Sequence, residues 1–269
     1  MLVCVHGWPE TKLIWEKVIE PLAAAGFDVV VPDLRGFGES DLAPDGLYDI
    51  VSHAADVAGL VFDVLGASSA TLVGGDLGGP VIQEVALRHP QQVDGLVVFN
   101  CPLPYDKKAM SHLRTRAPRE TADYYLRQGT DADALATELG DEEARRTYIG
   151  RFYTVRNWAH PGAFGPDDVA RHVAPFADGA RLRATFGNYE SAFDAAKRRE
   201  TPLFGPNPHH EVLVIFGTSD SVIYPDFDLM AQVVFARAHT PVRLDGCGHF
   251  VPWEKPDRFC EEVIAFVRR

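Results

Sequence analysis

Short apolar runs alternate with longer amphipathic segments along the first hundred residues of the chain. The runs are partly β-branched and are bounded by glycine, proline or polar residues, which is typical of buried strands. The segments between them repeat apolar positions at helical spacing. Strands are expected at residues 2–5, 29–31, 70–73 and 96–99, and helices at 13–25, 50–65 and 80–89. This alternation predicts an α/β fold, a mostly parallel sheet with helices on both faces.

The alternation stops at Asn100 and resumes only after residue 208. Between these points no segment indicates a strand, and clusters of proline and glycine separate the helical segments. Helices are expected there at residues 121–128, 131–139, 142–153 and 178–199. The later part predicts strands at 212–216 and 241–244 and helices at 226–236 and 256–267. We therefore expect a core in two parts, residues 1–100 and 209–269, with an inserted helical cap at 101–208.

Asp76 lies where a predicted strand turns into a predicted helix, within Gly74-Gly75-Asp76-Leu77-Gly78-Gly79. The glycines permit a sharp turn and close packing of helix on strand. The pattern is that of the G-x-S-x-G nucleophile elbow, with aspartate in place of serine. An aspartate is already an anion at neutral pH and can attack an electrophilic carbon directly to form an ester. The alternative is that Asp76 only caps the following helix.

The composition narrows the range of functions. The 269 residues are 46% hydrophobic and 24% charged, as in an ordinary globular protein. The net charge of −12 argues against a nucleic acid or an anionic membrane as partner. No apolar run has membrane-span length, and the first residues lack the basic segment of a signal peptide. Four cysteines at unrelated spacings are expected to be buried free thiols, which favours a cytoplasmic location: Cys4, Cys101, Cys247 and Cys260.

Five motifs in one order give the chain its resemblance to a known family. They are His6-Gly7-Trp8-Pro9, the loop from Asp33 to Asp41, the Asp76 elbow, Gly217-Thr218-Ser219-Asp220 and Gly248-His249-Phe250-Val251-Pro252. Together they span nearly the whole chain, which resembles the epoxide hydrolase branch of the α/β-hydrolase superfamily. Members of that branch carry two more strands before the first motif. The sequence begins with the strand that leads into this motif. In this fold the strand at 29–31 is then expected at the edge of the sheet, where an apolar strand favours pairing with another chain. A homodimer is one expectation.

The acid and the base follow from their positions. A catalytic acid belongs on a loop at the carboxyl edge of the sheet, and Asp220 lies four residues beyond Phe216, where the strand at 212–216 ends. His249 follows the last predicted strand, so the order is nucleophile, acid, base. Some relatives place the acid after the strand at 96–99, but Asn100 stands there and cannot ionise.

The other histidines are expected to have different roles. His209 and His210 lie beside prolines and are expected in a surface loop rather than at a metal site, and the resemblance makes His6 structural. No metal and no cofactor are expected.

The resemblance also implies further site residues. The backbone N–H groups of Trp8 and Leu77 are expected to form the oxyanion hole. Two cap tyrosines are expected to donate to the epoxide oxygen: Tyr124, 48 residues after Asp76, and Tyr189, 31 residues before the acid (124 − 76 and 220 − 189). Tyr125 is an alternative to Tyr124. Tyr125 and Trp8 are also expected to contact the substrate.

The expected reaction is hydrolysis of a small apolar epoxide by water to a vicinal diol, through an ester on Asp76. One alternative is a haloalkane or haloacid dehalogenase with the same nucleophile. Haloalkane dehalogenases place a tryptophan, and fluoroacetate dehalogenases an arginine, after the nucleophile; Leu77 offers neither. Another alternative is a non-catalytic binding protein on the same fold, because a fold does not fix a function.

Overall fold

The computed structural model describes residues 1–117, 123–156 and 158–269. In these residues six strands form one sheet in the order β2-β1-β3-β4-β5-β6, and all neighbouring strands run parallel. The strands are β1 (Leu2–Val5), β2 (Val29–Val30), β3 (Ala70–Gly75), β4 (Val93–Phe99), β5 (Val212–Gly217) and β6 (Val242–Leu244). Every residue of β1, β3 and β5 is buried, as expected for strands covered on both faces.

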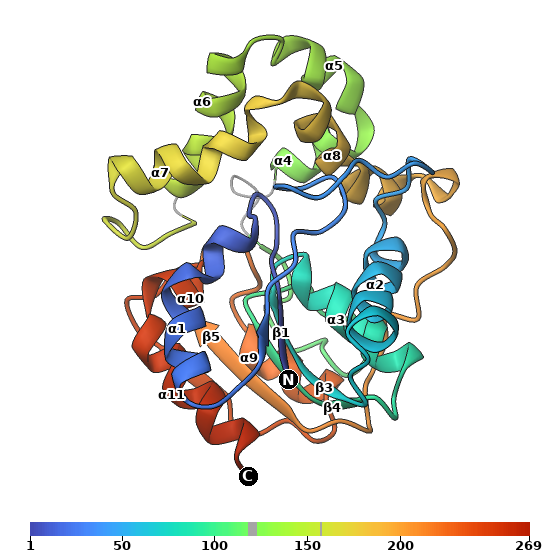
Figure 1. Cartoon of the computed structure of the whole chain (residues 1–269), viewed down its shortest axis with the longest axis vertical. Coiled ribbons are helices and arrows are strands. Elements are labelled where there is room, and N and C mark those ends of the chain that lie inside the picture. The colour runs from blue at the N-terminus through green and yellow to red at the C-terminus, as the bar shows by residue number, and fades with distance from the viewer. Residues whose placement is uncertain (118–122, 157) are drawn as a thin grey trace.

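Helices cover both faces of the sheet, as the alternation predicts (Figure 1). One face carries α1 (Glu16–Ala24) and α11 (Pro256–Val267), which pack together, and the other carries α2 (Ile50–Ala58) and α3 (Gly78–Arg88). Helix α9 (Phe227–Val234) is the helix expected at 226–236. Sequence analysis missed the short helix α10 (Val251–Glu254). The expected helix at 50–65 is α2 followed by a π-helical segment, Gly59–Val64.

The described helices between β4 and β5 lie together beyond the carboxyl ends of the strands (Figure 1). They are α4 (Asp123–Thr130), α5 (Ala132–Glu138), α6 (Glu142–Tyr153), α7 (Pro166–Val173) and α8 (Gly179–Phe193). The start of the helix expected at 121–128 lies outside the described residues. Sequence analysis missed α7, because Gly165 and Pro166 resemble a loop although Pro at the first helical position is favourable.

The helix expected at 178–199 is too long by six residues. Helix α8 ends at Phe193, and Asp194 then caps a separate 3₁₀ turn, Ala195–Lys197, by accepting from the Ala196 N–H at 2.9 Å. An aspartate favours a new cap over the continuation of a helix, because its side chain competes for backbone donors.

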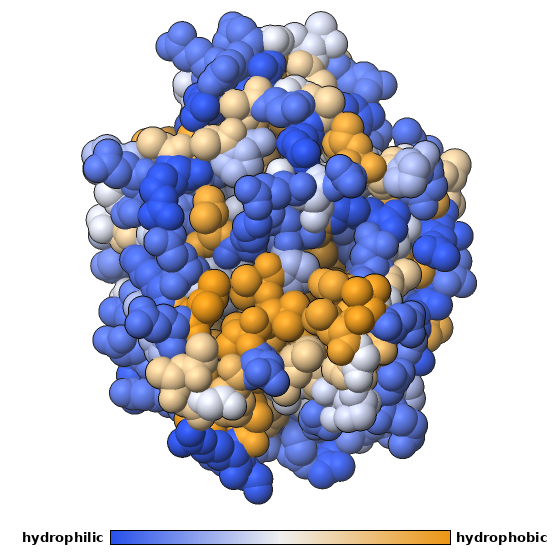
Figure 2. Space-filling model, viewed as in Figure 1, coloured by the Kyte–Doolittle hydropathy of each residue, from blue (hydrophilic) through white to orange (hydrophobic). Residues whose placement is uncertain are grey.

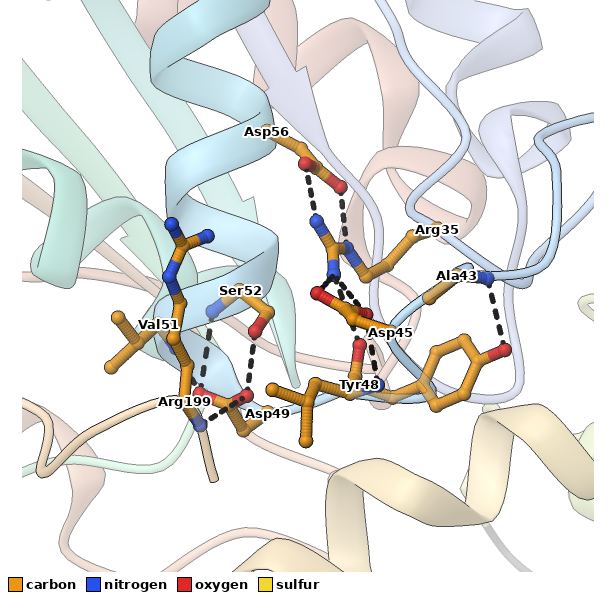
Figure 3. Close-up of polar contacts among 10 residues, drawn as sticks. Arg35, Ala43, Asp45, Tyr48, Asp49, Val51, Ser52, Asp56 and Arg199 are labelled. Atoms are coloured by element: carbon orange, nitrogen blue, oxygen red, sulfur yellow. Dashed lines mark hydrogen bonds and ion pairs between the residues drawn. The ribbon is translucent and has the colours of Figure 1, made fainter. Parts of the chain in front are cut away.

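The loop of the second motif is fixed by Arg35 (Figure 3). Its guanidinium donates to Asp56 of α2 at 2.5 and 2.6 Å and to Asp45 at 3.2 Å. Four residues after Asp45, Asp49 caps α2 and also accepts from the backbone N–H of Arg199 at 3.1 Å (Figure 3). The loop therefore joins the core to the segment that returns from α8.

The edge of the sheet is apolar. As expected, β2 is the edge strand, and Val29 and Val30 are only half-buried. Figure 2 shows apolar side chains across the middle of this face, over the region of β1 and β2. Whether two copies pair through this edge stays a prediction.

The four cysteines are buried free thiols, as expected. None of the described helices combines the length and the apolar character that a membrane span requires.

Candidate active site

Asp76 lies on a sharp turn between β3 and α3. Its φ is +43°, a left-handed conformation that is unfavourable for a residue other than glycine. A β-carbon at Gly78 would lie 2.1 Å from the carbonyl oxygen of Val5, so only glycine lets α3 approach β1 this closely. The Asp76 N–H donates to the Asn100 carbonyl at 3.1 Å. The turn holds the carboxylate at the carboxyl edge of the sheet and leaves it 8% exposed.

Asp220 and His249 meet although they lie on different loops. Asp220 follows β5 and His249 follows β6. The Asp220 Oδ2 lies 2.8 Å from His249 Nδ1, while its Oδ1 accepts from the N–H groups of Val222 and Ile223 at 2.6 and 3.2 Å. The carboxylate is therefore fixed by its own loop and orients the imidazole through one ring nitrogen.

The other ring nitrogen of His249 faces the elbow. Nε2 lies 3.3 Å from Asp76 Oδ2, but the two are not aligned as a hydrogen bond. Burial lowers the pKa of His249, yet the carboxylates of Asp220 and then Asp76 outweigh this and hold it well above the ordinary histidine value. The three residues proposed from sequence as nucleophile, acid and base thus lie in contact.

One of the two expected oxyanion-hole donors already binds the carboxylate. The Trp8 N–H donates to Asp76 Oδ1 at 2.7 Å. Leu77 is the N-cap residue of α3, and among the described residues its N–H makes no hydrogen bond to Asp76. The Trp8 side chain has no exposed surface. Whether Trp8 contacts the substrate stays a prediction.

Tyr124 and Tyr189 lie together above the elbow. Their ring centroids are 5.6 Å apart, and the two phenols share a hydrogen bond. Burial is the main cause that raises the pKa of both well above the ordinary tyrosine value, and the Asp76 carboxylate raises it further. Both phenols therefore keep their protons at neutral pH. Tyr125 stacks on Phe193 and is 37% exposed, so the structure pairs Tyr124 rather than Tyr125 with Tyr189.

A cavity of about 1230 Å³ lies between the cap helices and the elbow. Asp76, Leu77, Tyr124, Tyr125 and Tyr189 are among the residues that line it. A space of this size accommodates a small organic molecule together with water. The cavity brings Asp76 and both phenols to one surface.

Sequence analysis missed two buried residues next to this group. Glu10 is 4% exposed and accepts from the Gly7 N–H at 2.5 Å. Burial, and then the Asp76 carboxylate, raise its pKa to about 7. Trp158 packs against the His249 ring at 4.9 Å and accepts from the His249 N–H at 2.8 Å. Glu10 directly follows the motif His6-Gly7-Trp8-Pro9, and this position could have identified it from the sequence. Trp158 lies in no motif that would have pointed to the site.

The histidine assignments need one correction. His210 is 4% exposed and hydrogen-bonds to Asn207, so the expectation that it lies in a surface loop is wrong for this residue. His209 is exposed. Within the described ranges no cluster of three or more histidine, cysteine or carboxylate side chains could hold a metal. His6 accepts from the Leu34 N–H at 3.0 Å, a structural contact.

The sequence profile of the α/β-hydrolase fold matches residues 1–256. The chain belongs to the α/β-hydrolase fold family. This α/β-hydrolase has the expected parallel sheet, with its elbow after β3 and its histidine after the last strand.

Relatives of this α/β-hydrolase carry the name expected from the motifs. The epoxide hydrolase of Caballeronia sordidicola is 28% identical, and the match covers 100% of this chain and 87% of the relative. Epoxide hydrolase A of Mycobacterium tuberculosis H37Rv is also 28% identical, over 99% and 90%. The solved structure of the epoxide hydrolase CorEH without ligand has a TM-score of 0.82 at 24% identity, over 99% and 90%, and shows the shared fold. The resemblance to epoxide hydrolases and the assignment as a hydrolase are confirmed.

Proposed function

We propose that the protein hydrolyses an epoxide to a vicinal diol through an ester on Asp76, within a core of residues 1–100 and 209–269 covered by a cap of residues 101–208. The observation that carries the proposal is the pairing of two neutral phenols, Tyr124 and Tyr189, in the same cavity as an elbow carboxylate. A carboxylate supplies the nucleophile, and a phenol supplies the proton that the opened ring requires.

Ring opening is the first step. An oxygen of Asp76 attacks one ring carbon, the bond from that carbon to the epoxide oxygen breaks, and its electron pair moves to the oxygen. Tyr189 or Tyr124 donates a proton to this oxygen, which stays in the product as a hydroxyl. Because Trp8 N–H binds Oδ1, Oδ2 is the freer oxygen for the attack.

Hydrolysis of the ester is the second step. His249 removes a proton from water, whose oxygen attacks the carboxyl carbon of Asp76. The N–H groups of Trp8 and Leu77 stabilise the oxyanion of the tetrahedral intermediate. The intermediate then collapses: its hydroxyl proton passes to the departing alkoxide, which leaves as the diol, and the carboxylate is restored. The proton held by His249 returns through water to the tyrosinate left by ring opening.

The charge of Asp76 links the two steps. In the resting enzyme this carboxylate contributes to the raised pKa of His249. An ester carries no charge, so this contribution disappears when the ring opens. The pKa of His249 then falls, and the imidazole becomes available as a base when the ester is ready for hydrolysis.

The names of the relatives support an epoxide as substrate. A dehalogenase needs donors for a departing halide, and the Trp8 indole N–H is already bound to Thr185 at 3.0 Å. A screen of aryl and alkyl epoxides against haloalkanes and haloacids distinguishes the two activities by release of diol or halide. Diol from epoxides is expected, and halide release without diol would assign the site to the rival reaction.

A single turnover in heavy-oxygen water tests the ester. Water attacks the carboxyl carbon of the enzyme, so the label should enter Asp76 and be found by peptide mass analysis. Label in the diol alone would mean direct attack by water on the epoxide. His249→Gln should accumulate the ester, visible as added mass on the intact protein.

A further inference from the structure

The Trp8 indole N–H makes its hydrogen bond to a residue of the cap, Thr185. The indole is fully buried, and its Nε1–H donates to the hydroxyl of Thr185 at 3.0 Å. That hydroxyl in turn donates to the Leu182 carbonyl at 2.8 Å, within the same helix. Thr185 has no exposed surface. Its single proton is therefore committed to the helix, and its oxygen accepts from the indole.

The same indole supports both cap tyrosines. Tyr124 stacks face to face on Trp8, with ring centroids 5.3 Å apart and an interplanar angle of 5°. Tyr189 meets Trp8 edge to face, at 5.6 Å and 88°. A shift or rotation of the indole therefore moves the surface against which both phenols rest.

The Trp8 backbone binds the nucleophile while its side chain binds the cap. Its N–H donates to Asp76, and Thr185 lies four residues before Tyr189 on α8, on the same face of the helix. One residue thus spans the distance from the attacking carboxylate to the proton donors. Phe152 and Trp158 also pack edge to face on the indole. The hydrogen bond to Thr185 adds a directional restraint to these ring contacts.

We propose that Thr185 is a positioning residue for ring opening. It acts through the Trp8 indole to hold the hydroxyl groups of Tyr124 and Tyr189 where they can donate to the epoxide oxygen. This inference rests on the proposed function. It assigns Thr185 no contact with the substrate. It also gives the Trp8 side chain a role in the first chemical step that is separate from the oxyanion-hole role of its backbone.

Other contacts seat α8 on the core independently of Thr185. The ring of Tyr48 packs against Gly187, where a β-carbon would lie 2.9 Å from the ring, and the Arg181 side chain donates to the Ser40 carbonyl. Loss of the Thr185 hydroxyl should therefore leave the cap in place and disturb the indole. This separation makes the proposal testable by kinetics.

The test measures ester formation in a His249→Gln background, where the ester accumulates and quenched-flow samples can be read by intact mass. Thr185→Val keeps the shape of the side chain and removes the acceptor, whereas Thr185→Ser retains the hydroxyl. Thr71→Val is the matched control, because Thr71 is also a buried threonine but lies at the start of β3, where it pairs with Leu2. Ester hydrolysis is measured separately with His249 intact.

Thr185→Val should slow ester formation by at least about tenfold, because small misplacement of reacting groups is costly. Hydrolysis of the ester should change by less than about twofold, because His249, Asp220 and the Trp8 N–H are untouched. Thr185→Ser should restore most of the rate, and Thr71→Val should match the parent. A parent rate in Thr185→Val, or an equal loss in both steps, would overturn the proposal.

A double-mutant cycle separates this proposal from the proposed function. Trp8→Phe removes the indole N–H, so adding Thr185→Val to it should cost little more than Trp8→Phe alone. Fully additive effects on ester formation would show that the two residues act independently and would refute the coupling. If the parent in the His249→Gln background forms no ester with any epoxide, the proposed function fails, and the inference fails with it.

Discussion

Asp76 and Asn100 are joined by a hydrogen bond between their backbones, and both have the left-handed conformation that disfavours side chains. Their φ angles are +43° and +33°, and the Asp76 N–H donates to the Asn100 carbonyl at 3.1 Å. The Asn100 side chain accepts from the Gly217 N–H at 2.9 Å and donates to the Gly248 carbonyl at 3.0 Å. Asn100 therefore contacts Asp76, the end of β5 before the Asp220 loop, and Gly248, the neighbour of His249.

Asn100→Ala should destabilise the protein by about 2 kcal/mol or more, because a buried N–H and a buried carbonyl lose their partner. Asn100→Gly also lacks the amide but tolerates positive φ, so it should be more stable than the alanine variant by about 1 kcal/mol. Urea unfolding at neutral pH measures both. Equal stability of the two variants would show that the backbone conformation carries no strain.

Tyr189→Phe should slow ester formation by at least about tenfold, equivalent to 1.4 kcal/mol, and leave ester hydrolysis nearly unchanged. The phenol donates only while negative charge develops on the epoxide oxygen. The double variant with Tyr124→Phe should nearly abolish ring opening. Pre-steady-state kinetics on an aryl epoxide resolve the two steps, and Tyr105→Phe is the control, at an exposed tyrosine that does not line the cavity. Unchanged ester formation in the double variant would reduce the two residues to packing.

Asp76→Asn should lower the pKa of His249, because it removes one of the carboxylates that stabilise the imidazolium. Asp220→Asn should lower it further, since Asp220 makes the larger contribution. Titration of the histidine ring signals by NMR measures both shifts, with the His249 signal assigned from its loss in His249→Gln. His53, whose buried ring has a pKa of about 3, serves as the control that should not move. An unchanged His249 pKa in Asp76→Asn would contradict the proposed link between ring opening and base activation.

Glu10→Gln should make the free energy of unfolding less sensitive to pH. The pKa of Glu10 is raised from 4.5 to about 7, so between these values the folded protein holds a proton that the unfolded chain has released. Stability from this group is present below pH 4.5 and is lost as the pH rises to 7, by about 3 kcal/mol in total. Urea unfolding of both proteins at several pH values measures the difference. A difference that stays constant between pH 4.5 and 7 would show that Glu10 titrates normally.

The sequence by itself determined the fold class and the position of the elbow, and it predicted the chain order of the three residues proposed as nucleophile, acid and base. The elbow and the elements are local features: a strand, a glycine-rich turn and a helix lie within about twenty residues, and the periods of strands and helices are visible in the apolar pattern. Helices α6 and α11 match the expected bounds for the same reason. The end of α8 was predicted wrongly, because it depends on the competing cap at Asp194: the helix ends at Phe193 and not at the expected Arg199.

The tertiary structure alone decided which side chains meet. Trp8 lies 68 residues from Asp76 and 177 from Thr185, and no local pattern records a contact over such separations. The choice of Tyr124 over Tyr125 depends on which face of α4 turns toward α8, and the raised pKa of Glu10 depends on burial by distant segments. Side-chain contacts and desolvation are properties of the packed chain, because they arise only when residues remote in sequence exclude water from the same small volume.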